Sequence, residues 1–315
     1  MTSDSPIGIS LENQKCLVLG GSGFLGANLC SALLEETAAV SYFSRTANQI
    51  TGAAWIPGDF CVDEDLRNAV LGFDIVFHLV STSTPASGDR NPLKDAQENL
   101  IQTLKLLDAC RDANVKRIVF VSSGGTLYGH AHIIPTPEDA VEQPVCAYGI
   151  SKLAIEKYLG LYERLYGLIA ISLRVANPYG PLQHSKKQQG AVGVFVNKAV
   201  RNEVVEIWGD GSVVRDYIYV ADVIDALVLA ASYSGCYRTF NIGSGVGLSL
   251  NSLIERIELA LNTKLIVRYD KARAVDVVRS VLDCSRAHRE LGWNPIVDMD
   301  DGIVRTVEWI QKNLG

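Results

Sequence analysis

Long apolar runs, paired cysteines and an excess of basic residues are all missing from this sequence. No stretch of its 315 residues approaches the ~20 consecutive apolar residues that a membrane-spanning helix needs. The first residues, 1–10, are polar and contain no apolar core of the kind that a secretion signal has. The sequence therefore predicts a cytoplasmic protein that does not cross a membrane.

The charge balance is acidic, with 29 Lys and Arg against 35 Asp and Glu and a net charge of −6. Nucleic-acid phosphates require a basic face, so this balance disfavours a nucleic-acid partner. The seven cysteines are odd in number and include no Cys-x-x-Cys pair, which disfavours both a zinc ribbon and a disulfide framework. We expect buried thiols in a reducing compartment and no metal site.

Short apolar runs alternate with longer amphipathic segments through the first half of the chain. This alternation predicts an α/β fold, a Rossmann-type doubly wound parallel sheet covered by helices on both faces. Strands are expected at residues 15–19, 40–44, 54–56, 75–80, 117–122 and 168–174. Helices are expected at residues 23–36, 92–113 and 147–166.

The character of the sequence changes after Asn177, where Pro178, Gly180 and Pro181 break the alternation. We predict a dinucleotide-binding domain over residues 1–177, with segments returning to it near 212–243, and a smaller α/β lobe over 178–315. In that lobe the pattern predicts a helix at 192–201, a strand at 204–208 and a C-terminal helix at 303–313.

A glycine-rich loop, residues 20–26, directly follows the first strand and opens the first helix. In such a loop Gly20 permits a tight turn, Gly23 lets the backbone approach a pyrophosphate, and Gly26 lets helix and strand pack closely. The helix N-terminus offers free N–H groups and a positive dipole end to the phosphates. The strand–loop–helix context predicts a dinucleotide cofactor, with Phe24 and Leu25 among the residues that hold it.

The end of the second strand leaves the choice of dinucleotide open. An acidic residue there would hydrogen-bond the ribose hydroxyls of NAD, but this chain has Ser44 and Arg45 instead. An arginine could accept the 2′-phosphate of NADP, or it could stack on adenine or be solvated. Both NAD and NADP are therefore compatible with this strand end.

Tyr148 and Lys152 are spaced i, i+4 in a predicted helix, which puts the phenol and the ammonium on one face. A tyrosine is a poor base at neutral pH, because its ordinary pKa is about 10. A nearby lysine and a positively charged nicotinamide favour the phenolate. Together with the glycine loop, this pair predicts redox chemistry on a hydroxyl or carbonyl group.

Further motifs extend over nearly the whole chain. They occupy residues 58–60 (GDF), 77–79 (FHL), Asn99, 122–129 (SSGGTLYG), 174–181 (RVANPYGP), 208–211 (WGDG) and 215–218 (RDYI). With the glycine loop and the Tyr148–Lys152 pair, this set resembles the extended short-chain dehydrogenase/reductase family, in its NAD-dependent epimerase/dehydratase branch. The nearest resemblance is to the UDP-glucose 4-epimerases and their nucleotide-sugar relatives.

The resemblance implies roles for individual residues. On the cofactor side, Asp59 would hold the adenine amine with Phe60 beside it, and Leu79, Ser81 and Asn99 would line the cleft. On the substrate side, a UDP-linked sugar would be held at its diphosphate by Asn177, Arg215 and Arg273. Guanidinium groups suit that task, because their planar fork matches phosphate oxygens. Members of the family commonly dimerise through helices such as 92–113 and 147–166, so a homodimer is implied.

Two positions depart from the family pattern. The family commonly has a serine or threonine that contacts the reacting sugar oxygen where this chain has Gly124. Ser123 or Thr126 could supply the hydroxyl, with Thr126 preferred. Ser280 falls where 4-epimerases limit the space beside the sugar 2-substituent, and a small serine suggests that an N-acetyl group fits.

These features favour a nucleotide-sugar 4-epimerase that works through a 4-keto intermediate with bound NAD. An NADPH-dependent 4-keto-sugar reductase is the alternative that Arg45 favours. A non-catalytic cofactor-binding protein is a third reading, which the intact Tyr148 and Lys152 oppose. A 4,6-dehydratase is rejected, because the acid–base pair Asp-Glu of those enzymes is replaced here by Gly125 and Thr126.

Overall fold

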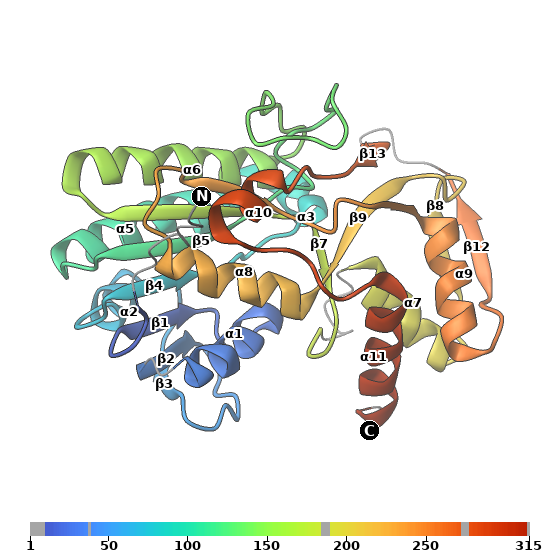
Figure 1. Ribbon diagram of the computed structural model, residues 1–315, viewed down its shortest axis with the longest axis horizontal. Coiled ribbons are helices and arrows are strands. Elements are labelled where there is room, and N and C mark those ends of the chain that lie inside the picture. Colours follow the sequence, from blue (N-terminus) through green and yellow to red (C-terminus); the bar gives the residue numbers. More distant parts are fainter. Residues whose placement is uncertain (1–9, 37–38, 184–189, 272–276, 314–315) are drawn as a thin grey trace, which may run out of the picture.

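The computed structural model describes residues 10–36, 39–183, 190–271 and 277–313 (Figure 1). Its centre is a parallel sheet of seven strands in the order β10-β6-β5-β4-β1-β2-β3. The strands are β1 (Lys15–Leu19), β2 (Ala39–Ser44), β3 (Ala54–Pro57), β4 (Ile75–His78), β5 (Arg117–Ser123), β6 (Ile169–Val175) and β10 (Thr239–Ile242). The predicted doubly wound α/β fold is confirmed.

The strand order reverses between β1 and β4, which lie side by side although two strands separate them in the sequence. The chain first builds outward from β1 to β3 and then crosses back to add β4, β5 and β6. In such a sheet ligands bind in the crevice beyond the carboxyl ends of the strands at this reversal. The glycine loop after β1 and the segment after β4 both lie at that place.

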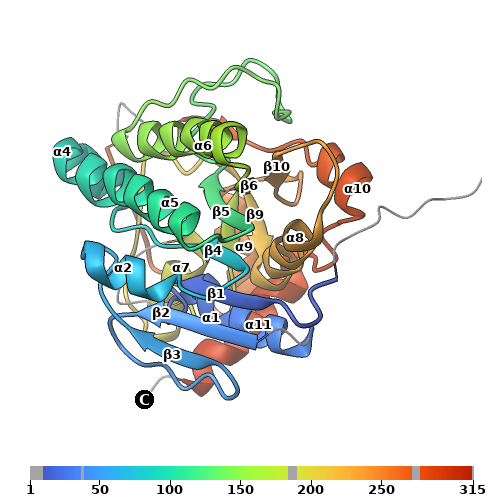
Figure 2. The ribbon, with the colours of Figure 1, turned by 90° about the vertical axis from the view of Figure 1, so that its left-hand side faces the viewer.

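Helices cover both faces of the sheet (Figure 2). They are α1 (Phe24–Glu35), α2 (Asp63–Ala69), α5 (Gln102–Asp112), α6 (Ala147–Tyr166) and α8 (Val220–Ser232). Alternate residues of β1 explain the two layers, because successive side chains of a strand point to opposite faces. Val18 packs in the core that α1 and α8 cover, whereas Leu17 packs in the core that α2, α5 and α6 cover.

The single helix predicted for residues 92–113 is interrupted in the structure. A short helix α3 (Pro85–Arg90) precedes α4 (Pro92–Asp95), a π-helical segment η1 (Ala96–Ile101) follows, and α5 completes the run. Side chains bind the helix backbone at the interruption: the Thr103 hydroxyl donates to the Asn99 carbonyl at 2.6 Å, and the Asn99 amide donates to the Asp95 carbonyl at 3.1 Å. Such side-chain bonds compete with regular helical bonds, which periodicity alone does not reveal.

The second half of the chain forms a smaller layer of strands and helices, seen at the right of Figure 1. One sheet contains four strands, β7 (Asn177–Tyr179), β9 (Val214–Tyr219), β11 (Gly247–Ser249) and β13 (Arg279–Ser280); another pairs β8 (Val205–Trp208) with β12 (Val267–Asp270). The helices of this layer are α7 (Ala191–Val200), α9 (Leu250–Leu261) and α11 (Met299–Lys312), whereas α10 (Ser285–Leu291) packs against β10 and α8. β10 leaves this part of the chain and pairs with β6 in the main sheet.

The predicted elements of the second half are present with shifted ends. The C-terminal helix begins at Met299 rather than at residue 303, because Asp298 caps it by accepting from the N–H groups of Asp300 and Asp301. Over the described ranges, the structure contains no helix with the length and apolar character required to cross a membrane.

Candidate active site

The glycine loop after β1 is closed by its own backbone. Gly20 has φ +84°, a conformation that side-chain-bearing residues rarely adopt. A Cβ on Gly26 would lie 2.3 Å from the Gly20 carbonyl oxygen, so only glycine lets α1 begin so close to the strand. A Cβ on Gly21 would lie 2.3 Å from the Cβ of Tyr42, a constraint from β2 that the sequence reading did not include.

The N-terminus of α1 has no side-chain cap. Gly23 is the N-cap residue and makes no side-chain hydrogen bond. Phe24 and Leu25 form the first turn, and their side chains pack against the core. The first backbone N–H groups of a helix have no partner within it, and they carry the positive end of its dipole. This end of α1 can therefore receive the phosphates of a dinucleotide.

The residues predicted to hold adenosine lie at the ends of β2 and β3. The Arg45 guanidinium lies 4.0 Å from the Asp59 carboxylate, and 79% of the arginine side chain is exposed. Ser44 is buried, and its hydroxyl donates to the Thr46 carbonyl at 2.7 Å. The ring of Phe60 is buried in the core rather than open to the crevice, and it stacks on His78 at 5.2 Å.

The predicted residues after β4 form a connected loop. Leu79 continues the strand, and its N–H donates to the Leu19 carbonyl at 3.2 Å. The Ser81 hydroxyl donates to the Ser83 carbonyl at 2.9 Å. Asn99 reaches this loop from η1, where its side-chain oxygen accepts from the Thr82 N–H at 2.9 Å. Asn99 therefore supports the wall of the crevice.

Tyr148 and Lys152 lie together at the start of α6, as their spacing predicts. The Lys152 ammonium is 5.6 Å from the centre of the Tyr148 ring and 4.5 Å from that of Phe120. It donates to the carbonyl of Val121 in β5 at 2.8 Å. α6 begins at Ala147, whose N–H donates to the Asp89 carboxylate at 2.8 Å.

Burial changes the acidity of both groups. Burial raises the pKa of the Tyr148 hydroxyl to about 12, with smaller contributions from Cys146 and Asp95, and hydrogen bonding by Ser81 opposes the rise. Burial lowers the pKa of Lys152 to about 8, against the charges of Glu156 and Asp95. Groups with such displaced pKa values are typical of sites that move protons.

The hydroxyl loop after β5, residues 122–129, explains the missing side chain at Gly124. A Cβ there would lie 2.4 Å from Cδ1 of Leu282 and 2.9 Å from the Arg174 carbonyl oxygen. Leu282 is buried and so occupies the space that a serine would need. The two alternative hydroxyls meet beside it, where Thr126 Oγ1 donates to Ser123 Oγ at 2.8 Å.

Gly149 lets α6 approach this loop. A Cβ at that position would lie 2.9 Å from the Thr126 carbonyl oxygen and 3.3 Å from the Thr126 Cβ. The residue that follows Tyr148 therefore brings the tyrosine's helix close to the Ser123–Thr126 pair. The sequence contains both glycines, but their contacts appear only in the fold.

Three predicted substrate residues lie in the four-stranded sheet. Arg215 in β9 is the register partner of Ser280 in β13, and Asn177 in β7 is the register partner of Tyr217 in β9. Arg215 and Tyr217 are two residues apart, so their side chains leave the same face. The Asn177 amide donates to the Asp216 carbonyl at 2.8 Å. Arg273 lies outside the described residues.

Two buried carboxylates that the sequence reading did not single out connect this site. Asp216 accepts from the N–H groups of Ser244, Gly245 and Leu282, and thereby joins β9 to the segments after β10 and β13. Asp95 accepts from side chains of η1, α6 and the loop after β4. Asp216 belongs to the RDYI motif, so the sequence could have indicated it as a site residue. Asp95 belongs to none of the motifs, so the sequence could not.

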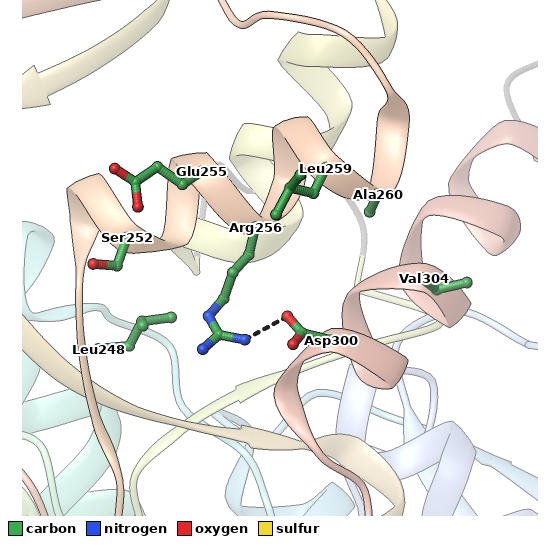
Figure 3. Close-up of a pocket in the computed structure, with 8 residues that line it drawn as sticks. All are labelled: Leu248, Ser252, Glu255, Arg256, Leu259, Ala260, Asp300 and Val304. Atoms are coloured by element: carbon green, nitrogen blue, oxygen red, sulfur yellow. Dashed lines mark hydrogen bonds and ion pairs between the residues drawn. The ribbon is translucent and has the colours of Figure 1, made fainter.

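A surface hollow between α9 and α11 is separate from these residues (Figure 3). Arg256 points across it to Asp300, and the two side chains form an ion pair of 2.5 Å. None of the residues predicted for catalysis or binding lines the hollow.

In the part of the chain that the structure describes, no group of three His, Cys, Asp or Glu side chains could hold a metal ion.

Comparisons with known proteins agree with this arrangement. Residues 16–243 match the model of the NAD dependent epimerase/dehydratase family. The putative UDP-glucose 4-epimerase of Methanocaldococcus jannaschii is 33% identical over 94% of this chain and 98% of its own length. The Thermotoga maritima UDP-glucose 4-epimerase, solved with UDP-glucose, has TM-score 0.90 and 35% identity over 96% of this chain and 100% of its own. The Thermus thermophilus UDP-glucose 4-epimerase, solved with NAD, has TM-score 0.89 and 30% identity over 95% of this chain and 99% of its own. This chain therefore belongs to the NAD-dependent epimerase/dehydratase family.

Proposed function

We propose that this protein is an NAD-dependent 4-epimerase of a UDP-linked hexose or N-acetylhexosamine. The observation that carries the proposal is the pairing of Tyr148 and Lys152 at the start of α6, with the lysine ammonium 5.6 Å from the tyrosine ring. Gly149, the residue after Tyr148, packs its backbone against Thr126, so the start of α6 lies close to the loop that contains Ser123 and Thr126. Family membership supplies the class of substrate, a sugar nucleotide.

The residues of the crevice fit a dinucleotide. The uncapped N-terminus of α1 and the glycine loop would hold its pyrophosphate, because the unpaired first N–H groups of the helix and the positive end of its dipole attract phosphate. Asp59 would meet the adenine end. When bound, NAD accepts a hydride from the sugar and returns it. Asp59 lies 4.0 Å from Arg45, and its negative charge would oppose a 2′-phosphate, which favours NAD over NADP.

The residues of this chain would then move the proton. The Tyr148 phenolate takes the proton of the sugar 4-hydroxyl as the 4-keto sugar forms. It returns the proton after the sugar has rotated to present its opposite face. The positive charges of Lys152 and of an oxidised nicotinamide favour that phenolate, which burial alone disfavours. The Ser123–Thr126 pair steadies the reacting oxygen. Arg215 and Asn177 would hold the diphosphate while the sugar rotates, and Arg273 is proposed as the second guanidinium on it.

Ser280 bears on which sugar the site accepts. It lies beside Arg215 in neighbouring strands, so a substituent on the sugar near the diphosphate would meet a small side chain. We propose that the pocket admits an N-acetyl group. Ser280→Tyr should reduce turnover of UDP-N-acetylglucosamine more than that of UDP-glucose, whereas Ser280→Ala should affect both little. Equal losses for both sugars in both variants would contradict this.

A homodimer is supported by the outer face of α6. Ile150, Tyr158 and Leu165 recur on it at nearly helical spacing and are all exposed. Leu93 in α4 and Ile101 in η1 are also exposed, and both elements pack against α6. Sedimentation should therefore give twice the mass of the chain, and the double variant Ile150→Glu, Tyr158→Glu should sediment with the mass of one chain.

All seven cysteines are free thiols, which fits the proposed cytoplasmic location.

The deciding experiment incubates the purified protein, without added cofactor, with a panel of UDP-, dTDP- and GDP-sugars that are then resolved by chromatography. An epimerase converts one UDP-sugar into its C4 epimer with no net use of cofactor. Tyr148→Phe should lower kcat by about 10²- to 10⁴-fold, since it lacks the acid–base group. Stoichiometric consumption of NADPH with a 4-keto sugar would instead establish the reductase. A protein that binds NAD but converts nothing would be the non-catalytic alternative.

A further inference from the structure

A buried carboxylate, that of Asp95, lies next to the catalytic helix and has no part in the proton transfer described above. Asp95 ends α4 and is only 2% exposed. Burying a carboxylate is costly unless its oxygens receive hydrogen bonds. Both do: Oδ2 accepts from the Ser151 hydroxyl at 2.5 Å, and Oδ1 accepts from the Ser83 hydroxyl and from the Asn99 amide at 3.3 Å.

The two serines belong to the two segments that meet at Tyr148. Ser151 lies in α6 between Tyr148 and Lys152, so its bond to Asp95 fixes how this part of the helix is turned. Ser83 lies in the loop after β4, where its carbonyl accepts from the Ser81 hydroxyl at 2.9 Å. One carboxylate therefore connects the tyrosine's helix with the loop after β4.

The backbone around Asp95 is shaped for this connection. A Cβ on Gly88 in α3 would lie 3.1 Å from Asp95 Oδ1 and 3.3 Å from the backbone nitrogen of Tyr148. η1 begins directly after Asp95, and π-helical segments are frequent at functional sites. The loop after β4, α3, α4 and α6 all converge on this one side chain.

We propose that Asp95 is a positioning residue whose carboxylate ties the loop after β4 to α6 and so fixes the place of Tyr148 relative to that loop. The inference rests on the proposed epimerase function, since it concerns the same tyrosine. Asp95 does not act by favouring the phenolate. Its charge, like Cys146, raises the pKa of Tyr148, while the Lys152 ammonium lies near the ring and donates to the Val121 carbonyl. Its contribution is therefore placement.

The test compares Asp95→Asn and Ser151→Ala with a matched control, Asp112→Asn, which removes an exposed carboxylate from the end of α5. Because a displaced tyrosine affects only the chemical step, Asp95→Asn should lower kcat about 10- to 100-fold and change KM less than threefold. Ser151→Ala should lose a similar factor, and the double variant should lose little more. Wild-type kcat in Asp95→Asn, or losses that multiply in the double variant, would overturn the proposal.

Hydrogen exchange followed by mass spectrometry gives a readout that needs no substrate. Asp95→Asn should speed exchange in peptides covering residues 81–84 and 147–152, and Asp112→Asn should not. Unchanged exchange overturns the role of Asp95, whereas a wild-type protein that converts no sugar nucleotide overturns the proposed function. If Asp95→Asn does not fold, Ser83→Ala and Ser151→Ala each remove one of the two connections and carry the same test.

Discussion

The proposed nucleotide end and the proposed sugar end of this site are built in different ways. At the nucleotide end, the glycine loop packs against itself, and Gly26 is constrained by the backbone of Gly20. At the sugar end, Gly124 is constrained by the side chain of Leu282, which comes from a distant part of the chain. The contact at Gly26 therefore arises within one contiguous motif, whereas the contact at Gly124 depends on how remote segments pack.

The largest effect is expected at the nucleotide end. Gly26→Ala places a Cβ 2.3 Å from a carbonyl oxygen and 2.6 Å from the Gly21 Cα, and neither atom can rotate away. We expect a loss of about 3 kcal/mol in unfolding free energy and loss of bound NAD. Urea unfolding and the absorbance of the purified protein measure both. A Gly26→Ala variant that keeps its stability and its cofactor would show that the backbone of the glycine loop can move to accept a side chain.

The sugar end should be damaged less and should be repairable. Gly124→Ser collides with a flexible leucine, so we expect a loss of about 2 kcal/mol in unfolding free energy. Adding Leu282→Ala opens space for the serine, and the double variant should be about 1 kcal/mol more stable than the two single losses predict. Part of the loss should remain, because the Arg174 carbonyl oxygen is 2.9 Å from the same Cβ. If the two losses in unfolding free energy simply add in urea unfolding, Leu282 does not constrain Gly124, and the contrast with the glycine loop is wrong.

A pH effect should come from Lys152. Its pKa is about 8 in the folded protein against an ordinary value of 10.5, so between these limits the unfolded chain binds more protons. Folding stability therefore rises with pH through this window. From pH 8 to pH 10 the cofactor-free wild type should gain about 2 kcal/mol relative to Lys152→Met. Urea unfolding of both proteins at the two pH values measures this difference, and a constant difference would contradict it.

The smallest effect is expected from the hydroxyl pair. Thr126 donates to Ser123, so the two hydroxyls form one unit at the sugar end. Thr126→Val and Ser123→Ala should each lower kcat about tenfold, equivalent to about 1.4 kcal/mol. The double variant should lose scarcely more than either single one. Losses that multiply would mean that the two hydroxyls act separately.

The fold around β1 to β6 followed from the sequence, because apolar strands and amphipathic helices have clear periods there. β1, Lys15–Leu19, and α6, Ala147–Tyr166, have the predicted limits. The π-helical break at residues 96–101 did not follow, because it depends on hydrogen bonds made by the side chains of Asn99 and Thr103.

The site residues likewise divide into those whose arrangement follows from local spacing and those whose arrangement depends on tertiary contacts. The spacing of Tyr148 and Lys152 determines their proximity, since both stand on one helix face. The pairing of Arg215 with Ser280 depends on the register of β9 and β13, two short strands far apart in sequence. The burial of Phe60 against His78 and the closure of Gly124 by Leu282 are likewise tertiary contacts. No local signal encodes them.

Gly124 and Leu282 share a single volume, and this has an evolutionary consequence. A side chain at Gly124 collides with Leu282 as long as the leucine keeps its size, so substitutions at the two sites should be inherited together. Among relatives, we expect a hydroxyl residue at the position of Gly124 to accompany a smaller side chain at that of Leu282. A lineage could then move its catalytic hydroxyl along the loop by exchanging one leucine, without altering the tyrosine or the lysine.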